Sequence, residues 1–135
     1  TCVVQLHNLQ ETYVFGKLHS IQDQAARIVI QDQNTKHEWY RYGYLHRNND
    51  LPSQIITIGT NYIEKNWYQN GQRHRDSDQP ACCIDSEHIM KRWYRYGQLH
   101  RDNDKPAYLF DKDRKWFQYG QLHRDNDMPA IVCES

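Results

Sequence analysis

Short runs of branched and aromatic residues alternate with turn-forming clusters along the whole chain. The runs cover residues 27–30, 54–58, 81–84 and 107–110, and the clusters that follow them cover 31–36, 59–61, 85–88 and 111–114. Branched and aromatic residues favour strands, whereas Gly, Asn, Asp and Ser favour turns. Residues 2–7 alternate between apolar and polar side chains and predict a strand that closes one end. The pattern predicts an all-β protein.

A frame of fifteen residues lies between these runs and returns five times, at residues 12–26, 39–53, 67–81, 93–107 and 116–130. The fourth copy reads WYRYGQLHRDNDKPA. Four copies open on a tryptophan, namely Trp39, Trp67, Trp93 and Trp116. The frame glycines stand 23 to 28 residues apart, at Gly16, Gly43, Gly71, Gly97 and Gly120. Such spacing is typical of repeat proteins, which bury their core between neighbouring units. We predict one repeat domain over residues 1–135.

The frame glycine predicts a hairpin turn inside each copy. Asn70-Gly71 is the strongest dipeptide for a type I′ turn, because Gly supplies the positive φ that the turn requires. The frame proline has no N–H and therefore bends the second strand of the hairpin. We predict an elongated meander with one antiparallel hairpin per copy. The first copy lacks the Trp, Arg and Pro of the others, which is typical of a capping unit.

Composition limits the kinds of partner. The chain is 38% hydrophobic and 13% aromatic, so its core should be thin and rich in aromatic rings. Seventeen Lys and Arg balance seventeen Asp and Glu, which leaves no net field to attract nucleic acid. No apolar run approaches the eighteen or so residues that a membrane span requires. We therefore predict protein partners and no nucleic acid, and membrane contact has only weak support.

The four cysteines have no metal-binding or redox spacing. Cys82 and Cys83 are adjacent and should point to opposite faces of a strand. We expect Cys2, Cys82, Cys83 and Cys133 to be reduced thiols of an intracellular protein, and a bridge between Cys2 and Cys133 stays open as an alternative.

Five histidines share one frame position and raise the question of a metal site; they are His19, His46, His74, His100 and His123. Equivalent residues of successive hairpins lie two strand spacings apart, roughly 9.5 Å. Two nitrogen ligands of one zinc ion lie within about 3.5 Å of each other. We therefore predict no metal and no cofactor, and we expect each imidazole to bond to the backbone or to an aspartate of the frame.

The third, fourth and fifth frames also carry paired acids beside an arginine. The spacing of a calcium-binding EF-hand loop is absent. We expect acids such as Asp102 and Asp104 to cap their own backbone amides two residues on and so to fix the bend before the proline. We expect the frame arginines to pair with an acid of the same or the next copy, and so to tie copies together.

No arrangement of residues indicates catalysis. The tripeptide His100-Arg101-Asp102 matches the catalytic loop of protein kinases, but it recurs at His74 and His123 without a glycine-rich phosphate loop. We predict that the protein is not an enzyme and has no catalytic residue.

Aromatic residues at the first, second and fourth frame positions have two interpretations, a core or an exposed platform. Because stacked hairpins must bury apolar side chains between them, we assign the tryptophans to the core. The second position faces the other way in a regular strand. Its residues are our candidates for binding a protein partner: Tyr40, Tyr68, Tyr94 and Phe117.

The segment Trp67-Tyr68-Gln69-Asn70-Gly71-Gln72-Arg73-His74 resembles the core of MORN repeats, and all five copies share the resemblance. MORN repeats form hairpins that stack into an elongated sheet. The chain departs from them after the histidine, where residues 101–107 read RDNDKPA in place of the usual Gly. This longer form is similar to repeats of proteins encoded by large DNA viruses of amoebae.

The resemblance implies a structural protein that binds other proteins, with a virion-associated role such as that of a minor capsid component. An intracellular location, including the virion, follows from the same resemblance. Two alternatives stay open: a lipid or membrane adaptor, as is suggested for some MORN proteins, and a regulatory binder similar to antitoxins with short repeats.

Overall fold

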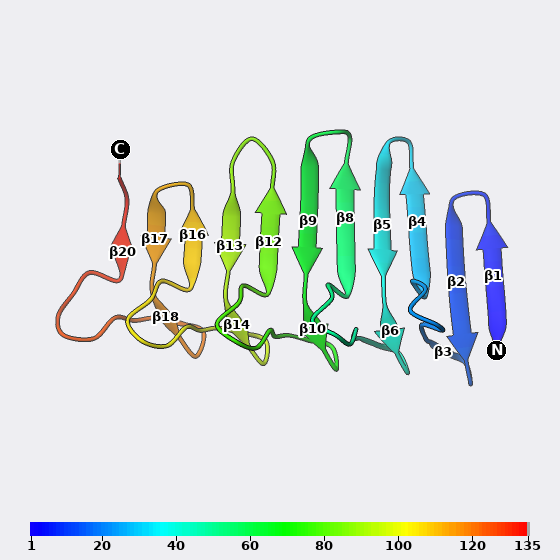
Figure 1. Ribbon diagram of the computed structural model, residues 1–135, viewed down its shortest axis with the longest axis horizontal. Helices are drawn as coiled ribbons and strands as arrows, with labels where there is room; N and C mark the ends of the chain where they lie inside the picture. The colour runs from blue at the N-terminus through cyan, green and yellow to red at the C-terminus, as the bar shows by residue number, and fades with distance from the viewer. Residues whose placement is uncertain (135) are drawn as a thin grey trace.

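The structure is a computed structural model that describes residues 1–134, and it contains one long antiparallel sheet (Figure 1). The main strands follow one another in chain order, and the two termini lie at opposite ends of the sheet. They are β1 (Cys2–Leu6), β2 (Leu9–Val14), β4 (Arg27–Gln31), β5 (Asn34–Glu38), β8 (Gln54–Ile58), β9 (Tyr62–Asn66), β12 (Cys82–Asp85), β13 (Met90–Arg92), β16 (Tyr108–Phe110), β17 (Asp113–Lys115) and β20 (Ile131–Val132). The predicted all-β elongated meander of hairpin repeats is confirmed.

Each repeat contributes two hairpins, where the sequence predicted one. The long hairpin lies in the main sheet and pairs an apolar strand with a polar one, as β4 pairs with β5. The sequence of β5 is NTKHE, and no hydrophobic pattern marks such a strand. This is why sequence periodicity missed the second hairpin.

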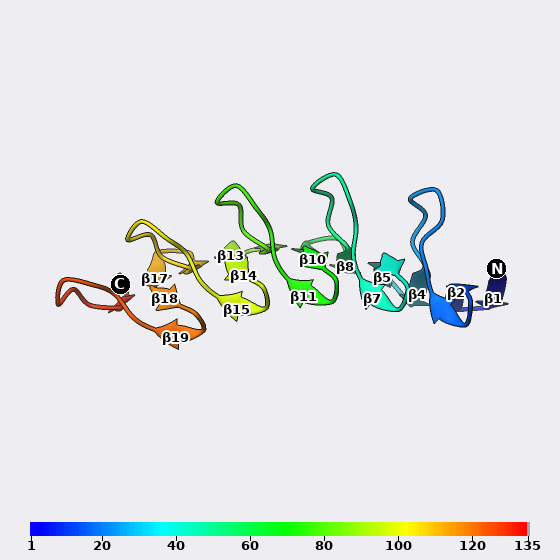
Figure 2. The ribbon, with the colours of Figure 1, turned by 90° about the horizontal axis from the view of Figure 1, so that it is seen from below.

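The short hairpin is the one that the frame glycine predicts. In copies two to five it forms a two-stranded sheet of its own below the main sheet, and in the first copy its second strand pairs with β2. The short strands are β3 (Lys17–Leu18), β6 (Tyr40–Arg41), β7 (Tyr44–Leu45), β10 (Tyr68–Gln69), β11 (Gln72–Arg73), β14 (Tyr94–Arg95), β15 (Gln98–Leu99), β18 (Phe117–Gln118) and β19 (Gln121–Leu122). The loops that follow the short hairpins project from one side of the row of strands (Figure 2).

The turn of the short hairpin has the geometry expected of type I′. Asn70 has φ of 49° and Gly71 has φ of 82°, so both central residues are left-handed. A Cβ atom at position 71 would also lie 3.2 Å from Cδ1 of Tyr44. The positive φ therefore favours glycine, and the Tyr44 side chain of the preceding copy would have to shift slightly to admit a larger residue.

The core lies where the short hairpins and loops fold back on the end of the main sheet. The four frame tryptophans expose only 7 to 9% of their surface. Ala26, Ala81 and Ala107 end their frames and are fully buried. A small residue at this position lets the returning chain approach the sheet closely, so the buried volume is mostly aromatic.

The cysteines occupy three different environments. Cys82 is buried and Cys83 is half-buried, as expected for neighbours on opposite faces of β12. Burial raises the pKa of Cys82 to about 11, so this thiol stays protonated at neutral pH. Cys2 and Cys133 lie at opposite ends of the sheet, which rules out a bridge between them within one molecule.

Residues 1–134 contain strands and turns only, and so they provide no helix that could cross a membrane.

Candidate functional site

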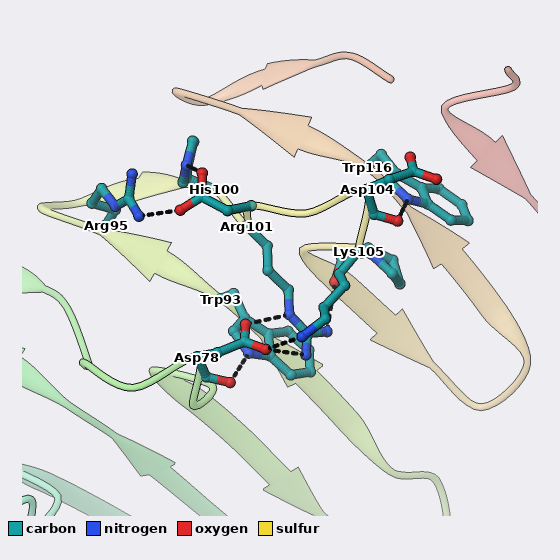
Figure 3. Close-up of polar contacts among 10 residues, drawn as sticks. Asp78, Trp93, Arg95, His100, Arg101, Asp104, Lys105 and Trp116 are labelled. Atoms are coloured by element: carbon teal, nitrogen blue, oxygen red, sulfur yellow. Dashed lines mark hydrogen bonds and ion pairs between the residues drawn. The ribbon is translucent and has the colours of Figure 1, made fainter. Parts of the chain in front are cut away.

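In copies two to five, an arginine forms an ion pair with an aspartate of the preceding copy. In the best-defined example, the guanidinium of Arg101 lies flat over Trp93, 3.8 Å from the ring centroid (Figure 3). It donates to both carboxylate oxygens of Asp78, at 2.7 and 3.1 Å, and to the carbonyl of Pro106 at 3.1 Å. The indole N–H of Trp93 donates to the main-chain carbonyl of Asp78 at 2.9 Å. Asp78 thus accepts hydrogen bonds from two side chains of the next copy, those of Arg101 and Trp93. We call this arrangement of aspartate, arginine and tryptophan the clamp.

The clamp fixes the charge of its aspartate. The hydrogen bond from Arg101 lowers the pKa of Asp78 to about 2; burial opposes this shift, and Lys105, whose ammonium lies 2.7 Å away, adds to the lowering. The Arg101 side chain is only 15% exposed, whereas that of Asp78 is 42% exposed. The pair is therefore half-buried and held by stacking as well as by charge, which distinguishes it from an ordinary surface ion pair.

The clamp occurs four times with nearly identical dimensions. The distance from guanidinium to ring centroid is 3.8 or 3.9 Å throughout, and the indole to carbonyl distance is 2.9 or 3.0 Å. The four sets are Arg47, Trp39 and Asp23; Arg75, Trp67 and Asp50; Arg101, Trp93 and Asp78; and Arg124, Trp116 and Asp104. In every set the aspartate belongs to the preceding copy. The sequence-based expectation of a partner in the same or the next copy was wrong in direction.

This direction explains why the first copy differs. Thr12 and Ser20 stand where later copies have Trp and Arg, and residues 1–11 before them contain no aspartate. Asp23 is kept, and it receives Arg47 of the second copy with both nitrogen to oxygen distances at 2.8 Å. The sequence carried this signal, since Trp and Arg are missing together while the aspartate stays.

The frame histidines connect the same pairs of copies through the backbone. Nδ1 of His74 accepts the main-chain N–H of Tyr96 at 3.2 Å, and Nε2 lies 2.9 Å from the Asp76 carboxylate. Since Nδ1 accepts, Nε2 carries the proton and donates it to Asp76. Nδ1 of His19, His46 and His100 accepts from the next copy in the same way. The rings of His19, His46, His74 and His100 therefore bond to the backbone. The expected bond to a frame aspartate is present at His74, His100 and His123.

A second backbone bond secures the tip of each short hairpin. The N–H of Gly97 donates to the carbonyl of Arg73 at 2.8 Å. Gly43, Gly71 and Gly120 make the equivalent bond to Leu18, Leu45 and Leu99, at 2.8 to 2.9 Å. In the clamp, histidine and glycine bonds the earlier copy supplies the acceptor and the later copy supplies the donor, whereas the N–H of Ser20 donates in the opposite direction, to the carbonyl of Tyr40 at 2.8 Å.

The paired acids act differently from the expectation. Asp102 bonds to His100 at 2.8 Å and Asp104 turns to Arg124 at 2.7 Å, so neither carboxylate caps its own chain. The bend is closed instead by the backbone, where the N–H of Lys105 donates to the Asp102 carbonyl. The side chains diverge, and within residues 1–134 no three His, Cys, Asp or Glu side chains gather as a metal site requires.

The aromatic residues at the second frame position are half-buried; they are Tyr40, Tyr68, Tyr94 and Phe117. We predicted from the sequence that these residues bind a protein partner. Arg73 lies between two of them, with its guanidinium 5.5 Å from the Tyr68 ring and 5.4 Å from the Tyr94 ring. The Tyr40 hydroxyl donates to Glu38. These residues pack within the molecule rather than forming an open surface.

The fourth-position aromatics are the exposed ones, with Phe15, Tyr42, Tyr96 and Tyr119 showing 50 to 91% of their surface. We call this set the tyrosine row. Tyr96 stacks on His74 of the preceding copy with ring centroids 4.2 Å apart, and Tyr119 packs on His100 at 4.4 Å. The rings are therefore held in place while one side stays open to solvent.

The backbone conformation at the tyrosine row favours asparagine over tyrosine. Tyr42, Tyr96 and Tyr119 have φ between 45° and 48°, a left-handed conformation that asparagine tolerates best and that asparagine adopts at position 70. A bulky aromatic residue there is unusual. Its retention in three copies indicates that the side chain itself has a use.

A row of buried polar residues also crosses the sheet, and no pattern in the sequence indicates it. Glu38 and Asn66 are almost fully buried, and Gln54 joins them, since it donates to Glu38 at 2.8 Å and accepts from Asn66 at 2.9 Å. Burial raises the pKa of Glu38, but hydrogen bonds from Lys36 and Gln54 outweigh it and the net pKa is lowered. Glu38, Gln54 and the Asn66 side-chain NH₂ group are hydrogen-bonded to one another or to neighbouring side chains, whereas the side-chain oxygen of Asn66 is buried without a partner among residues 1–134. The row therefore links neighbouring strands of the sheet.

Comparison with family models, with curated proteins and with solved structures finds no match to this chain, so the site rests on the geometry described above.

Proposed function

We propose that this protein is a non-catalytic β-repeat scaffold that binds protein partners along the tyrosine row and serves as a structural component of a larger assembly. The observation that carries the proposal is the presence of exposed aromatic residues at a backbone position that disfavours them. Tyrosine offers a large contact area at low entropic cost, and exposed aromatic patches are common features of protein interfaces.

The repeat structure suits such a role. The clamps fix each copy relative to its neighbour, so the fourth frame positions recur at intervals of two strands, roughly 9.5 Å, with Asn70 in place of an aromatic residue in the third copy. The balanced charge of the chain gives no long-range attraction to nucleic acid or anionic lipid, which favours protein among the possible partners. A MORN-like, virion-associated or minor capsid protein is the finer form of this proposal.

The test is affinity capture from the native source followed by mass spectrometry, with the intact protein and with a Tyr42→Asn, Tyr96→Asn, Tyr119→Asn variant. Asparagine keeps the backbone bonds and suits the left-handed turn, so the variant should fold. We expect a stoichiometric protein partner whose recovery falls at least tenfold with the variant.

A matched control replaces three exposed apolar residues near the far ends of the long hairpins, in an Ile30→Thr, Ile58→Thr, Ile89→Thr variant. This control should capture the partner as well as the intact protein does. Equal recovery with the tyrosine variant, or capture of lipid alone, would contradict the proposal. Structural virion proteins among the partners would support its finer form, whereas a small toxin would support the regulatory alternative.

A further inference from the structure

The residue directly before each frame changes from an acid to a base along the chain. These residues stand on one register line across the main sheet and therefore share one face. In chain order they are Glu11, Glu38, Asn66, Arg92 and Lys115. One face of the sheet is thus acidic at this position in copies one and two and basic in copies four and five.

In the first two copies the acid lies between a tyrosine and an arginine of the same chain. Glu11 accepts from the hydroxyl of Tyr13 at 2.7 Å and lies 3.0 Å from Nε of Arg27. Glu38 accepts from the hydroxyl of Tyr40 at 3.3 Å and lies 3.5 Å from the same arginine. This half of the face therefore supplies the carboxylates that its cation needs.

The other half of the face carries three cations without such carboxylates; they are Arg73, Arg92 and Lys115. Among residues 1–134 no acid forms an ion pair with any of them. The Nε atoms of Arg73 and Arg92 are buried with no hydrogen-bond partner in this part of the chain. A partly buried cation without a counter-charge is costly, so an anion bound here would be stabilising.

The two arginines lie near each other in the middle of the sheet. Cys82 of β12 stands opposite Arg92 of β13. Burial raises the pKa of the Cys82 thiol, and the charges of Arg73 and Arg92 both oppose the rise, so both guanidiniums lie close to this sulfur. Arg73 also lies 3.5 Å from the hydroxyl of Tyr94, two residues beyond Arg92. Two cations and a phenol thus meet where the second copy has a cation, an acid and a phenol.

An aromatic ring links Arg92 to the third cation. Tyr108 stands between Arg92 and Lys115 in the register of the sheet. The Arg92 guanidinium lies 5.3 Å from the ring centroid, and the Lys115 ammonium lies 5.0 Å from it. All three cations are half-buried, so the rings hold them in place while part of each side chain stays in contact with solvent. We call Arg73, Arg92 and Lys115 the cation row.

The acids of the same half of the face are occupied elsewhere or stand apart. Glu64 accepts from the Tyr62 hydroxyl and from the Asn66 amide, both at 2.8 Å. Asp113 precedes Lys115 by two residues and forms no ion pair within residues 1–134. The cation row is therefore a local positive patch on a chain whose formal charge is zero.

We propose that the cation row binds the carboxylates of an acidic protein segment, which take the place that Glu11 and Glu38 occupy in the first two copies. The chain itself shows that a carboxylate fits between this pair of residue types, and a carboxylate accepts charge-assisted bonds from Arg and Lys. The proposal goes beyond the scaffold role, because it concerns a different surface and names the chemistry of the partner.

The probe is a fluorescein-labelled octaglutamate peptide, titrated with the full chain and followed by fluorescence anisotropy. We expect saturable binding that weakens as salt is added, and no binding of an octaglutamine peptide. An Arg73→Leu, Arg92→Gln variant should bind at least tenfold more weakly. Four of the five copies have leucine at the position of Arg73, so the fold accepts this side chain.

A charge-matched control removes two cations from the opposite face of the same strands, in a Lys65→Gln, Lys91→Gln variant. Both lysines are exposed and stand opposite Cys83 in the register. The control should bind the peptide as the intact protein does, and so should the variant with asparagine at three tyrosine-row positions, which separates this test from that of the scaffold role. An equal loss with the lysine control, or tighter binding of a single-stranded oligonucleotide than of the peptide, overturns the proposal.

A second variant, Arg92→Glu, gives the fourth copy the acid that the first two copies carry. The new carboxylate should pair with Arg73 and accept from the hydroxyl of Tyr94, as Glu38 does with its neighbours. We expect peptide binding to be lost while the urea midpoint stays at least as high as that of the intact protein. Retained binding, or a lowered midpoint, would show that Arg92 serves the sheet rather than a ligand.

Discussion

Replacing Trp93 by alanine should destabilise the protein by about 3–5 kcal/mol, the usual cost of deleting a buried aromatic side chain. Trp93 is 7% exposed, donates to Asp78 and supplies the surface on which Arg101 stacks. Because small domains are stable by only about 5–15 kcal/mol, a large share of the total would be lost. Urea unfolding monitored by circular dichroism measures the change.

Trp93→Phe is the matched control, since it keeps an aromatic face for Arg101 and removes only the indole N–H. We expect it to cost about 1–2 kcal/mol, close to the value of one buried hydrogen bond and a small loss of volume. Repeat proteins couple mainly to their nearest neighbours, so the alanine variant should also lower the denaturant m-value if copies separate. A cost below about 1 kcal/mol for Trp93→Ala would contradict a core built on the tryptophans.

Changing three clamp arginines together, in an Arg47→Lys, Arg75→Lys, Arg101→Lys variant, should cost about 3 kcal/mol, roughly 1 kcal/mol per clamp. Lysine keeps the charge but cannot stack flat on the tryptophan and bond both carboxylate oxygens. The arginine side chains are only 14 to 16% exposed, so solvent screens these pairs less than ordinary surface pairs. The shift of the urea midpoint measures the loss.

The same substitution at three arginines outside the clamps is the control, in an Arg41→Lys, Arg95→Lys, Arg114→Lys variant, and it should change the urea midpoint little.

The dependence of stability on pH provides a second measurement of the clamps. Hydrogen bonds from the clamp arginines lower the pKa of Asp23, Asp50 and Asp78, the last from 3.8 to about 2. A lowered pKa contributes stability that is complete above pH 4 and is lost as the pH falls toward 2. The difference between wild type and clamp variant should therefore shrink over this interval, and a constant difference would contradict a contribution from the bidentate bond between arginine and the ionised carboxylate.

The sequence was sufficient for the features that each copy carries within itself. The recurring Gly predicted the short hairpin, and the apolar runs predicted the first strand of each long one. Turn chemistry and strand preference are local properties, so one copy is enough to read them. Repetition then predicted the extended meander, because equivalent units can only stack on one another.

Features that depend on contact between copies were predicted less well. Arg101 could reach acids in several copies, and only the three-dimensional stack selects Asp78. Tyr94 and Tyr96 alternate in sequence as strand neighbours do, but the left-handed turn at Tyr96 turns it outward while Tyr94 packs on Arg73. The exposed surface was consequently assigned to the second frame position, whereas the structure places it at the fourth.

Hydrogen exchange at the tips of the short hairpins tests the central claim, that the earlier copy accepts hydrogen bonds from the later one. Tip amides of two-residue turns usually face solvent, but those of Tyr42, Asn70, Tyr96 and Tyr119 donate to a histidine of the preceding copy. Phe15 occupies the same position, and within residues 1–134 no frame histidine accepts its N–H. We predict slow exchange at the four later tips and fast exchange at Phe15. Equally fast exchange at all five would contradict the directional stack.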